Sequence, residues 1–382
     1  MRPIMNKNRI LAAALLLLSA CAYKLPEALV LKIFDKHSFR QHDPEKLRAL
    51  IREKGLAGLK QEDRYAEVVR ARRGAKMSTV KPPPSAGVLV SERGGEYFLL
   101  RVFKKSPAEA AGLKDGDKVL AVNSAPAGSP EFLKALSGPQ DFKFRVSRPS
   151  RRGAEELEAE VKGGEFYLPP IFGFYEPETK TAFLRIGLFF AKSASLAAEG
   201  LASLEKRGAR NLVLDLRGNQ GGSPDEAADL LALLADKDGP VLGVASRHEG
   251  YTVTYTAPGK GRFAGLRAVV LTDGATAMAA EVAAAALRET AEARVAGGKT
   301  AGNVSVVKTF SLGEGRGLNV TVARLVSPSG LDLEGAGLQP DAPVAVPAAP
   351  AWSALPASAL FNDGAWLKAL ELIRSAEAPP RR

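Results

Sequence analysis

The sequence predicts an α/β protein whose main part is an open sheet with helical crossover connections. Three patterns support this fold class. Between residues 166 and 345, apolar strand-like runs alternate with helix-like segments. Residues 82–165 instead show short strands between Gly-containing turns, and residues 22–80 show apolar residues at helical spacing. Three successive folded parts fit within 382 residues, with enough chain to bury a core.

The elements follow in chain order from these patterns. Residues 24–75 are expected to be helical, with Pro44 in the first turn of a helix after Asp43. A Pro-rich stretch at 81–85 marks a domain boundary, and the part after it is expected to hold one helix, 130–136. The third part is expected to contain strands 182–186, 211–216, 241–246, 268–272 and one near Val295, with helices 195–206, 224–234 and 277–289. A linker and a short helix with Trp366, Leu370 and Ile373 on its buried face complete residues 346–382.

Composition excludes several classes of protein. With 46% hydrophobic and 25% charged residues, the chain is neither disordered nor fibrous. One Cys excludes an intrachain disulfide, and the three His residues form no metal-ligand motif, so we expect no metal and no cofactor. Residues 293–300 resemble a nucleotide-binding loop but begin with Ala293 where that loop needs Gly. The net charge of +11 is spread over scattered basic residues, so we expect a solvated surface and no nucleic-acid partner.

Residues 1–21 have the pattern of an export signal. Basic residues precede an apolar run at 10–18 that is too short to remain as a membrane-spanning helix. The run ends in Leu18-Ser19-Ala20-Cys21, which resembles a bacterial lipobox and implies cleavage before a diacylated Cys21. Ala22 in place of Asp implies, by the same resemblance, the periplasmic face of the outer membrane. A plain secretory signal is the alternative.

The stretch 106–123 contains Ala111-Gly112-Leu113, then Gly116-Asp117, then an apolar strand. It resembles the most recognisable part of a bacterial PDZ domain, in which the Gly-Asp pair makes the turn that leads into the strand. PDZ domains bind extended C-terminal tails by strand addition. The resemblance places the carboxylate-binding loop at Ala86-Gly87-Val88-Leu89 and implies peptide or protein C-terminal tails as partners. A PDZ-like fold with a blocked groove is the alternative.

The stretch Asp215-Leu216-Arg217-Gly218-Asn219-Gln220-Gly221-Gly222 follows a strand and opens a helix. It resembles the signature of the C-terminal processing (tail-specific) serine peptidases. Further matches follow at 274–281, 297–302 and 321–341, so the resemblance covers about residues 25–345. It implies a tail-specific-peptidase α/β core (ClpP/crotonase-like) at 166–345, a PDZ domain at 82–165 and an N-terminal helical segment at 22–80.

The sequence departs from this family at the catalytic positions. The resemblance implies a Ser nucleophile three residues before Glu281, a Lys general base after Gly302, and an assisting Gln four residues later. This chain has Met278, Asn303 and Val307 there. Met carries no acidic proton and cannot form an acyl-enzyme. The backbone amides that would form an oxyanion hole, those of Gly221, Gly222 and Ala279, do not depend on these side chains.

We therefore expect an exported lipoprotein that is catalytically degenerate and acts by binding peptide tails or partner proteins. The alternative is an active serine endopeptidase with a non-standard nucleophile, for which Thr276, Ser305 and Lys299 are the candidate residues. A third possibility is a structural envelope protein whose groove binds nothing. Neither the identity of the partner nor the oligomeric state follows from the sequence.

Overall fold

The computed structural model describes residues 27–70, 85–137, 141–151, 153–164, 166, 168–345 and 363–377. The chain divides into two compact units. The first is Met1–Ala75 with Val306–Ala323, and the second is Lys76–Ser305 with Arg324–Arg382. Several predictions lie outside the described residues: the export signal at 1–21 with the lipidated Cys21, and the linkers at 81–84 and 347–356.

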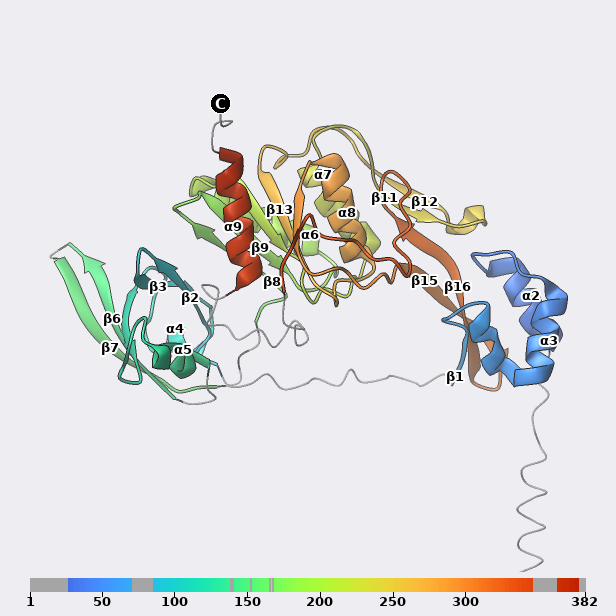
Figure 1. Ribbon diagram of the computed structural model, residues 1–382, viewed down its shortest axis with the longest axis horizontal. Helices are drawn as coiled ribbons and strands as arrows, with labels where there is room; N and C mark the ends of the chain where they lie inside the picture. Colours follow the sequence, from blue (N-terminus) through green and yellow to red (C-terminus); the bar gives the residue numbers. More distant parts are fainter. Residues whose placement is uncertain are drawn as a thin grey trace, which may run out of the picture. The chain divides into compact units, whose positions relative to one another are not determined.

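The first unit combines helices with a few strands. Its helices are α2 (Glu27–His37), α3 (Pro44–Lys54) and the 3-10 helix η1 (Gly55–Gln61) (Figure 1). Its strands are β1 (Glu67–Arg70) and the adjoining parts of β15 (Ser305–Gly313) and β16 (Arg316–Val326), with β1 antiparallel to β16. Helix α3 begins as predicted, because the Asp43 side chain accepts a hydrogen bond from the Glu45 amide at 2.9 Å.

Long-range contacts hold this unit together. Apolar residues three and four apart on α2, namely Val30, Ile33 and Phe34, belong to one core with residues of β16. The carboxylate of Asp63 accepts hydrogen bonds from the amide and hydroxyl of Thr321 at 2.7 and 2.8 Å. A segment about 250 positions later in the chain therefore completes the core of the N-terminal helices.

The second unit begins with a small antiparallel sheet in the order β2-β3-β4-β6-β7, with β5 beside β4. The strands are β2 (Val88–Arg93), β3 (Glu96–Val102), β4 (Lys118–Val122), β5 (Ala125–Pro126), β6 (Phe142–Ser150) and β7 (Gly153–Val161). Two helices, α4 (Pro107–Ala110) and α5 (Pro130–Ser137), complete it. Asp117, next to the Gly116 turn, forms a two-point ion pair with Arg148 at 2.6 and 2.7 Å that ties β4 to β6.

The rest of the second unit is built on a six-stranded sheet in the order β17-β14-β13-β10-β9-β8. The strands are β8 (Ile171–Glu176), β9 (Thr181–Ile186), β10 (Asn211–Asp215), β13 (Arg267–Thr272), β14 (Arg294–Gly297) and β17 (Ala342–Pro343). All neighbours pair in parallel except β8 and β9. Every residue of β9 and β10 is buried, as expected of parallel strands covered on both faces.

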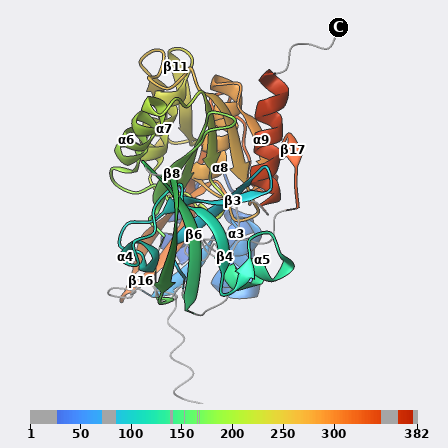
Figure 2. The same cartoon turned by 90° about the vertical axis from the view of Figure 1, so that its left-hand side faces the viewer.

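Helices cover both faces of this sheet. Helices α6 (Ser193–Lys206), α7 (Pro224–Leu234) and α8 (Ala279–Thr290) connect successive strands, and α9 (Gly364–Glu377) packs on the opposite face, as Figure 2 shows. Trp366 of α9 stands edge-on to Phe174 and Phe183 of the sheet, with ring centroids 5.5 Å apart in both pairs. A further antiparallel pair, β11 (Gly239–Ala245) and β12 (Val253–Ala257), flanks η2 (Glu249–Tyr251) and joins the end of β16.

The α/β class is confirmed, and most predicted elements of the core lie within two residues of their predicted bounds. The prediction of helix throughout 24–75 fails at β1, which is a strand. Strands β8, β12, β15 and β16 were not predicted, and β15 and β16 supply Val306–Ala323 to the first unit. The apolar residues Leu318 and Val320 of β16 pack in the core of the first unit, against segments far away in the chain.

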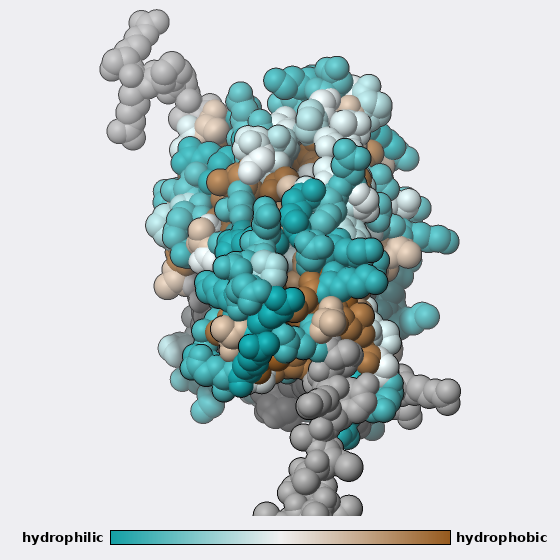
Figure 3. Space-filling view, turned by 90° about the vertical axis from the view of Figure 1, so that its right-hand side faces the viewer, coloured by the Kyte–Doolittle hydropathy of each residue, from teal (hydrophilic) through white to brown (hydrophobic). Residues whose placement is uncertain are grey.

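The surface fits a solvated, charged protein. Hydrophilic side chains cover most of the face in Figure 3, and hydrophobic ones form small separate areas. None of the helices in the described parts of the chain has the length and hydrophobicity needed to cross a bilayer.

Candidate functional site

The loop after β10 begins at a buried group of charges. Asp215 is fully buried, and its carboxylate lies 2.8 Å from Nη1 of Arg185 and 2.8–2.9 Å from Nη2 and Nε of Arg217. Burial alone would raise the pKa of Asp215, but the charges of Arg217 and Arg185 outweigh it and lower this pKa to about 2. The ionised carboxylate therefore fixes Arg217 at the start of the Gly-rich loop.

Asp215 and Arg217 belong to the motif visible in the sequence, but two of their partners, Arg185 and Asp363, lie outside it. Arg185 lies on β9, beside Asp215 in the parallel register. Asp363 precedes α9, and its carboxylate lies 2.8 and 2.7 Å from Nη1 and Nη2 of Arg217, across 146 positions of sequence. A signal for Arg185 was available, because an Arg inside an apolar parallel strand needs a buried anion; nothing local pointed to Asp363.

Asn219 shapes the Gly-rich loop itself. Its Nδ2 donates to the carbonyl of Ile186 at 2.9 Å, and its own carbonyl accepts from the Ala277 amide at 2.9 Å. Gly221 has a φ of +100°, and a Cβ at this position would lie 2.4 Å from Cβ of Met278. Only glycine permits this approach, so the loop lies directly against residue 278.

Met278 is the residue before α8, and its backbone has φ +54° and ψ −129°. Glycine adopts this conformation readily, but it costs an L-residue on the order of 1–3 kcal/mol. The Met278 amide donates to the carbonyl oxygen of Asn303 at 2.8 Å. The positions where the family resemblance implies nucleophile and base are therefore neighbours here, occupied by a thioether and a carboxamide.

The carboxylate of Glu281 joins these two positions. It is fully buried and accepts four hydrogen bonds: Oε2 from the Thr300 hydroxyl at 2.7 Å and the Gly302 amide at 2.9 Å, and Oε1 from the amides of Asn303 at 2.8 Å and Met278 at 3.2 Å. Burial raises the pKa of Glu281, and the hydrogen bonds oppose that rise. Glu281, Thr300 and Gly302 are also the motif residues from which the family resemblance locates the nucleophile position, Met278, and the base position, Asn303.

Replacing Glu281 by Gln should loosen this junction. The Gln side chain has one acceptor oxygen, so its NH₂ group would face two of the four donors. We expect a loss of about 1–3 kcal/mol in the free energy of unfolding, the cost of leaving buried donors unpaired. Urea denaturation measures this, with Glu199→Gln on the exposed face of α6 as the matched control. A loss equal to that of the control would contradict the role assigned to Glu281.

The three predicted oxyanion donors do not behave alike. The Gly221 amide donates to Oδ1 of Asn219 at 2.8 Å, so Gly221 is withdrawn as a donor to a ligand. Within the described residues, the amides of Gly222 and Ala279 have no hydrogen-bond acceptor. A Cβ on Gly222 would meet the carbonyl oxygen of Phe189 at 2.0 Å, which explains the glycine there. The amide without an acceptor nearest to Met278 is thus that of Ala279, the next residue, while Gly222 lies against Phe189.

Thr276, Lys299 and Ser305, the candidate residues of the alternative, lie in different surroundings. Thr276 is fully buried, and its hydroxyl donates to the carbonyl of Leu216 at 3.0 Å and lies 3.1 Å from Oδ1 of Asp273. It links the loops after β10 and β13. Lys299 is exposed. Ser305 is buried at the start of β15, and Val307 lies two residues further along this strand with 38% exposure.

The expected carboxylate loop, Ala86-Gly87-Val88-Leu89, is buried throughout. The Gly87 amide donates to Oγ of Ser85 at 3.1 Å, and the Gly87 carbonyl accepts from the Phe103 amide at 3.0 Å. Leu89 belongs to the same apolar cluster as Phe103 and Phe172 of the core. In this conformation the Gly87 amide is therefore occupied by Ser85, and the assignment of residues 86–89 as the carboxylate-binding loop stays a prediction.

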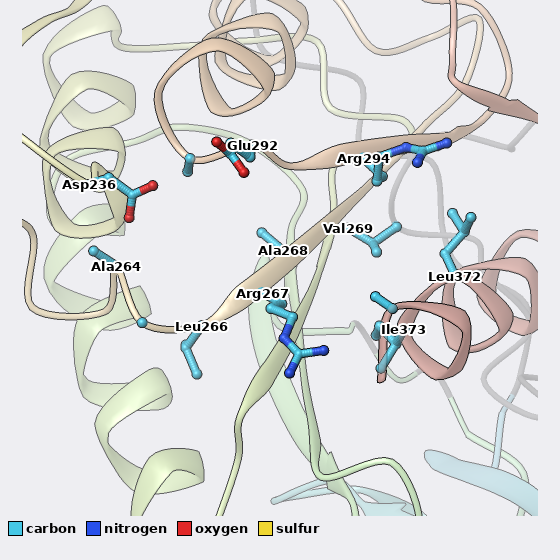
Figure 4. Close-up of a pocket in the computed structure, with 13 residues that line it drawn as sticks. Asp236, Ala264, Leu266, Arg267, Ala268, Val269, Glu292, Arg294, Leu372 and Ile373 are labelled. Carbon is cyan, nitrogen blue, oxygen red and sulfur yellow. The ribbon is translucent and has the colours of Figure 1, made fainter. Parts of the chain in front are cut away.

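A cavity of about 300 Å³ lies elsewhere on the second unit, at the amino ends of β13 and β14. Figure 4 shows Asp236 and Glu292 on one side, Arg267 and Arg294 nearer α9, and apolar residues between them. All four charged residues are exposed, and Met278 follows the opposite end of β13, so the cavity is separate from the site. Among the described residues, no group of three or more His, Cys, Asp or Glu could hold a metal ion.

The sequence is similar to known peptidases over the part of the chain that contains this site. Residues 180–344 match the model of peptidase family S41. The chain is 27% identical over 264 residues to the carboxy-terminal processing protease CtpB of Bacillus subtilis (strain 168), covering 66% of this chain and 54% of that protein. It is 28% identical over 290 residues to the carboxyl-terminal-processing protease of Picosynechococcus sp. (strain ATCC 27264 / PCC 7002 / PR-6), covering 73% of this chain and 69% of that protein. The chain thus spans little more than half the length of the Bacillus relative.

Among solved structures, the photosystem II D1 C-terminal processing protease has a similar fold, with a TM-score of 0.52 at 20% sequence identity. The match covers 84% of this chain and 92% of that one. It spans both the α/β sheet and segments before it, beyond the residues matched by the family model. Residues 180–344 therefore match peptidase family S41, and the chain as a whole is similar to C-terminal processing proteases.

Proposed function

We propose that this chain is a member of family S41 that binds protein tails without cleaving them. The observation that carries the proposal is Met278, which holds the strained backbone conformation and the neighbours of the site but has no nucleophilic atom. Asn303, whose carboxamide cannot accept a proton at neutral pH, lies beside it. The free amides of Gly222 and Ala279 can still bind a peptide carbonyl or carboxylate.

The named relatives are C-terminal processing proteases, and this supports tails as the class of partner. Residues 82–165 enter the proposal as a PDZ domain. Supporting features are the edge position of β2 in its sheet and the Gly116 turn that leads into β4. Because residues 86–89 are buried, a tail that pairs with β2 would first have to displace the contacts that cover this loop.

The test uses the full chain and an unstructured peptide with an apolar C-terminus, as free acid and as C-terminal amide. We expect the free acid to bind and to stay intact by mass spectrometry. Amidation should weaken binding by about 1.5–3 kcal/mol, the usual worth of a hydrogen bond to a charged group. Equal binding of acid and amide would contradict carboxylate recognition, and no binding of either would favour a purely structural protein. Cleavage that is lost in Lys299→Ala would establish the alternative, an active serine-type endopeptidase.

The proposal also places the protein on the periplasmic face of the cell envelope, anchored by lipid on Cys21 and most simply at the outer membrane. The single Cys follows the apolar run at the position of a lipobox. Two acyl chains give stable membrane binding where one gives only marginal binding. Mass spectrometry of the mature N-terminus should show a diacylated Cys21, and Cys21→Ser should move the protein into the soluble fraction. A Cys21→Ser protein that remains equally membrane-bound would contradict the anchor.

A further inference from the structure

A carboxylate at the start of helix α9, that of Asp363, binds the Gly-rich loop after β10. Asp363 precedes this helix and accepts the amides of Ala365 and Trp366 at 3.0 and 3.1 Å, as an N-cap residue does. The same carboxylate also pairs with Arg217, with Oδ1 2.8 Å from Nη1 and Oδ2 2.7 Å from Nη2. Asp363 therefore caps helix α9 and, with the same carboxylate, binds Arg217 of the Gly-rich loop.

The charges around Arg217 balance only when α9 is docked. Asp215 contacts two guanidinium groups, those of Arg185 and Arg217, so this trio carries a net charge of +1. The side chains of Arg185 and Arg217 are only 2% and 5% exposed. Asp363 brings the group to neutrality. Removing that charge leaves a buried guanidinium partly uncompensated, an arrangement that proteins tolerate poorly.

The position of Arg217 is transmitted directly to the backbone beside Met278. The next residue, Gly218, donates its amide to Oδ1 of Asp273 at 3.0 Å, and the same oxygen accepts the amides of Ala275 and Thr276, each at 3.0 Å. One carboxylate oxygen thus joins the loop after β10 to the loop that carries Met278. A shift of Arg217 would move Gly218 and disturb both.

From these contacts we propose that Asp363 is a positioning residue, through which the docked helix α9 holds the loop 216–222 in the conformation that flanks Met278. The ligand-binding consequence rests on the proposed function: undocking of α9 changes the affinity of the site for a protein tail. The positioning itself is a property of the fold and does not depend on what the site binds.

The chain offers variants that separate charge from packing. In Asp363→Asn, the side-chain oxygen can still cap α9, but the charge is gone and an NH₂ group faces the guanidinium. Asp363→Glu restores the charge on a longer side chain. Leu204→Ala is the packing control, because Leu204 is buried near the end of α6, on the other face of the sheet from α9, and takes no part in the charge network.

The experiment measures amide hydrogen exchange in the full-length variants, comparing a peptide that covers 216–223 with peptides from β9 and β13. In Asp363→Asn we expect exchange in 216–223 to accelerate about tenfold or more relative to those strands. Asp363→Glu should recover at least part of this protection. Leu204→Ala should lower the melting temperature without changing the ratio of exchange in 216–223 to exchange in the strands. Unchanged exchange in Asp363→Asn, or an equal change of this ratio in Leu204→Ala, would overturn the positioning role.

Tail-peptide binding, measured on the same variants, distinguishes this inference from the proposed function. If the wild-type chain binds the free-acid peptide, Asp363→Asn should change its Kd at least about threefold and Asp363→Glu should bring it back towards the wild-type value. If the wild-type chain binds no peptide, the proposed function fails, and the exchange data alone decide whether Asp363 positions the loop. Binding that is identical in wild type and Asp363→Asn would contradict control of the site by α9.

Discussion

Asp215→Asn is expected to lower the free energy of unfolding by about 3–5 kcal/mol, the usual cost of removing one partner from a buried ion pair. Asp215 is the anion shared by Arg185 and Arg217, and all three side chains are almost wholly buried. Asn fills the same space, so the loss comes from charge and not from a cavity. Because domains are stable by only about 5–15 kcal/mol, the variant should unfold at a much lower urea concentration.

The matched control is Glu371→Gln, which neutralises a carboxylate 2.7 Å from Nζ of Lys368 on the exposed face of α9. Exposed pairs contribute about 0–1 kcal/mol, so this variant should unfold close to the wild-type midpoint. Equal losses of unfolding free energy in the two variants would show that the buried ion pairs stabilise the fold no more than an exposed pair does.

The same carboxylate makes stability depend on pH. The pKa of Asp215 falls from its ordinary value of 3.8 to about 2 in the folded chain, mainly because the charges of Arg217 and Arg185 overcome the effect of burial. Its contribution to stability is therefore present above about pH 4 and is lost as the pH falls towards 2. The difference in unfolding free energy between wild type and Asp215→Asn should shrink over that interval. A difference that stays constant from pH 6 to pH 2 would contradict the assignment.

The largest functional effect is expected when Met278→Ser is combined with Asn303→Lys. A Ser hydroxyl needs a neighbouring base, and a general base contributes about 10²- to 10⁴-fold in rate. Residue 278 already has its positive φ, and the amides of Gly222 and Ala279 have no acceptor within the described residues. We expect cleavage of an unstructured protein substrate by the double variant, at a rate at least about 10² times that of either single variant, provided that the pocket lowers the pKa of the new Lys.

The control for this experiment is Met278→Ala combined with Asn303→Lys, which carries the base without the nucleophile and should be as inactive as the wild type. Release of new N-termini from the substrate measures turnover. Activity in this control would mean that cleavage comes from another residue. Wild-type activity that disappears in Lys299→Ala would replace the binding proposal by the alternative of an active endopeptidase.

Much of the site could be derived from the sequence because its signals are local. Gly221 and Gly222 stand where the backbone turns at positive φ, and Pro224 opens the helix that follows, so the loop is visible in the order of residues. The spacing of Glu281 from Met278 places both at the start of one helix, where they share a hydrogen bond. The identities of Met278 and Asn303 carry the proposed loss of catalysis without any coordinates.

Other features depend on contacts between distant segments. Free amides cannot be told from occupied ones in a sequence, and only the structure shows that the Gly221 amide donates to the side chain of Asn219. Likewise, only the structure shows that Leu89, in the predicted carboxylate-binding loop, packs in the same cluster as Phe172 of the core. In both cases the outcome was decided by neighbours whose side-chain directions are set only in the folded chain.

The sequence by itself determined the α/β class, the signature loop after β10 and the residues at the catalytic positions, because periodicity and turn chemistry act over a few residues. Only the tertiary structure decided that Val306–Ala323 completes the core of the N-terminal helices, and that Asp363 neutralises Arg217 from 146 positions away. The physical reason is the same for both. Burial of apolar surface and pairing of buried charges stabilise the fold whichever segment supplies the side chains, however far away in the sequence that segment is.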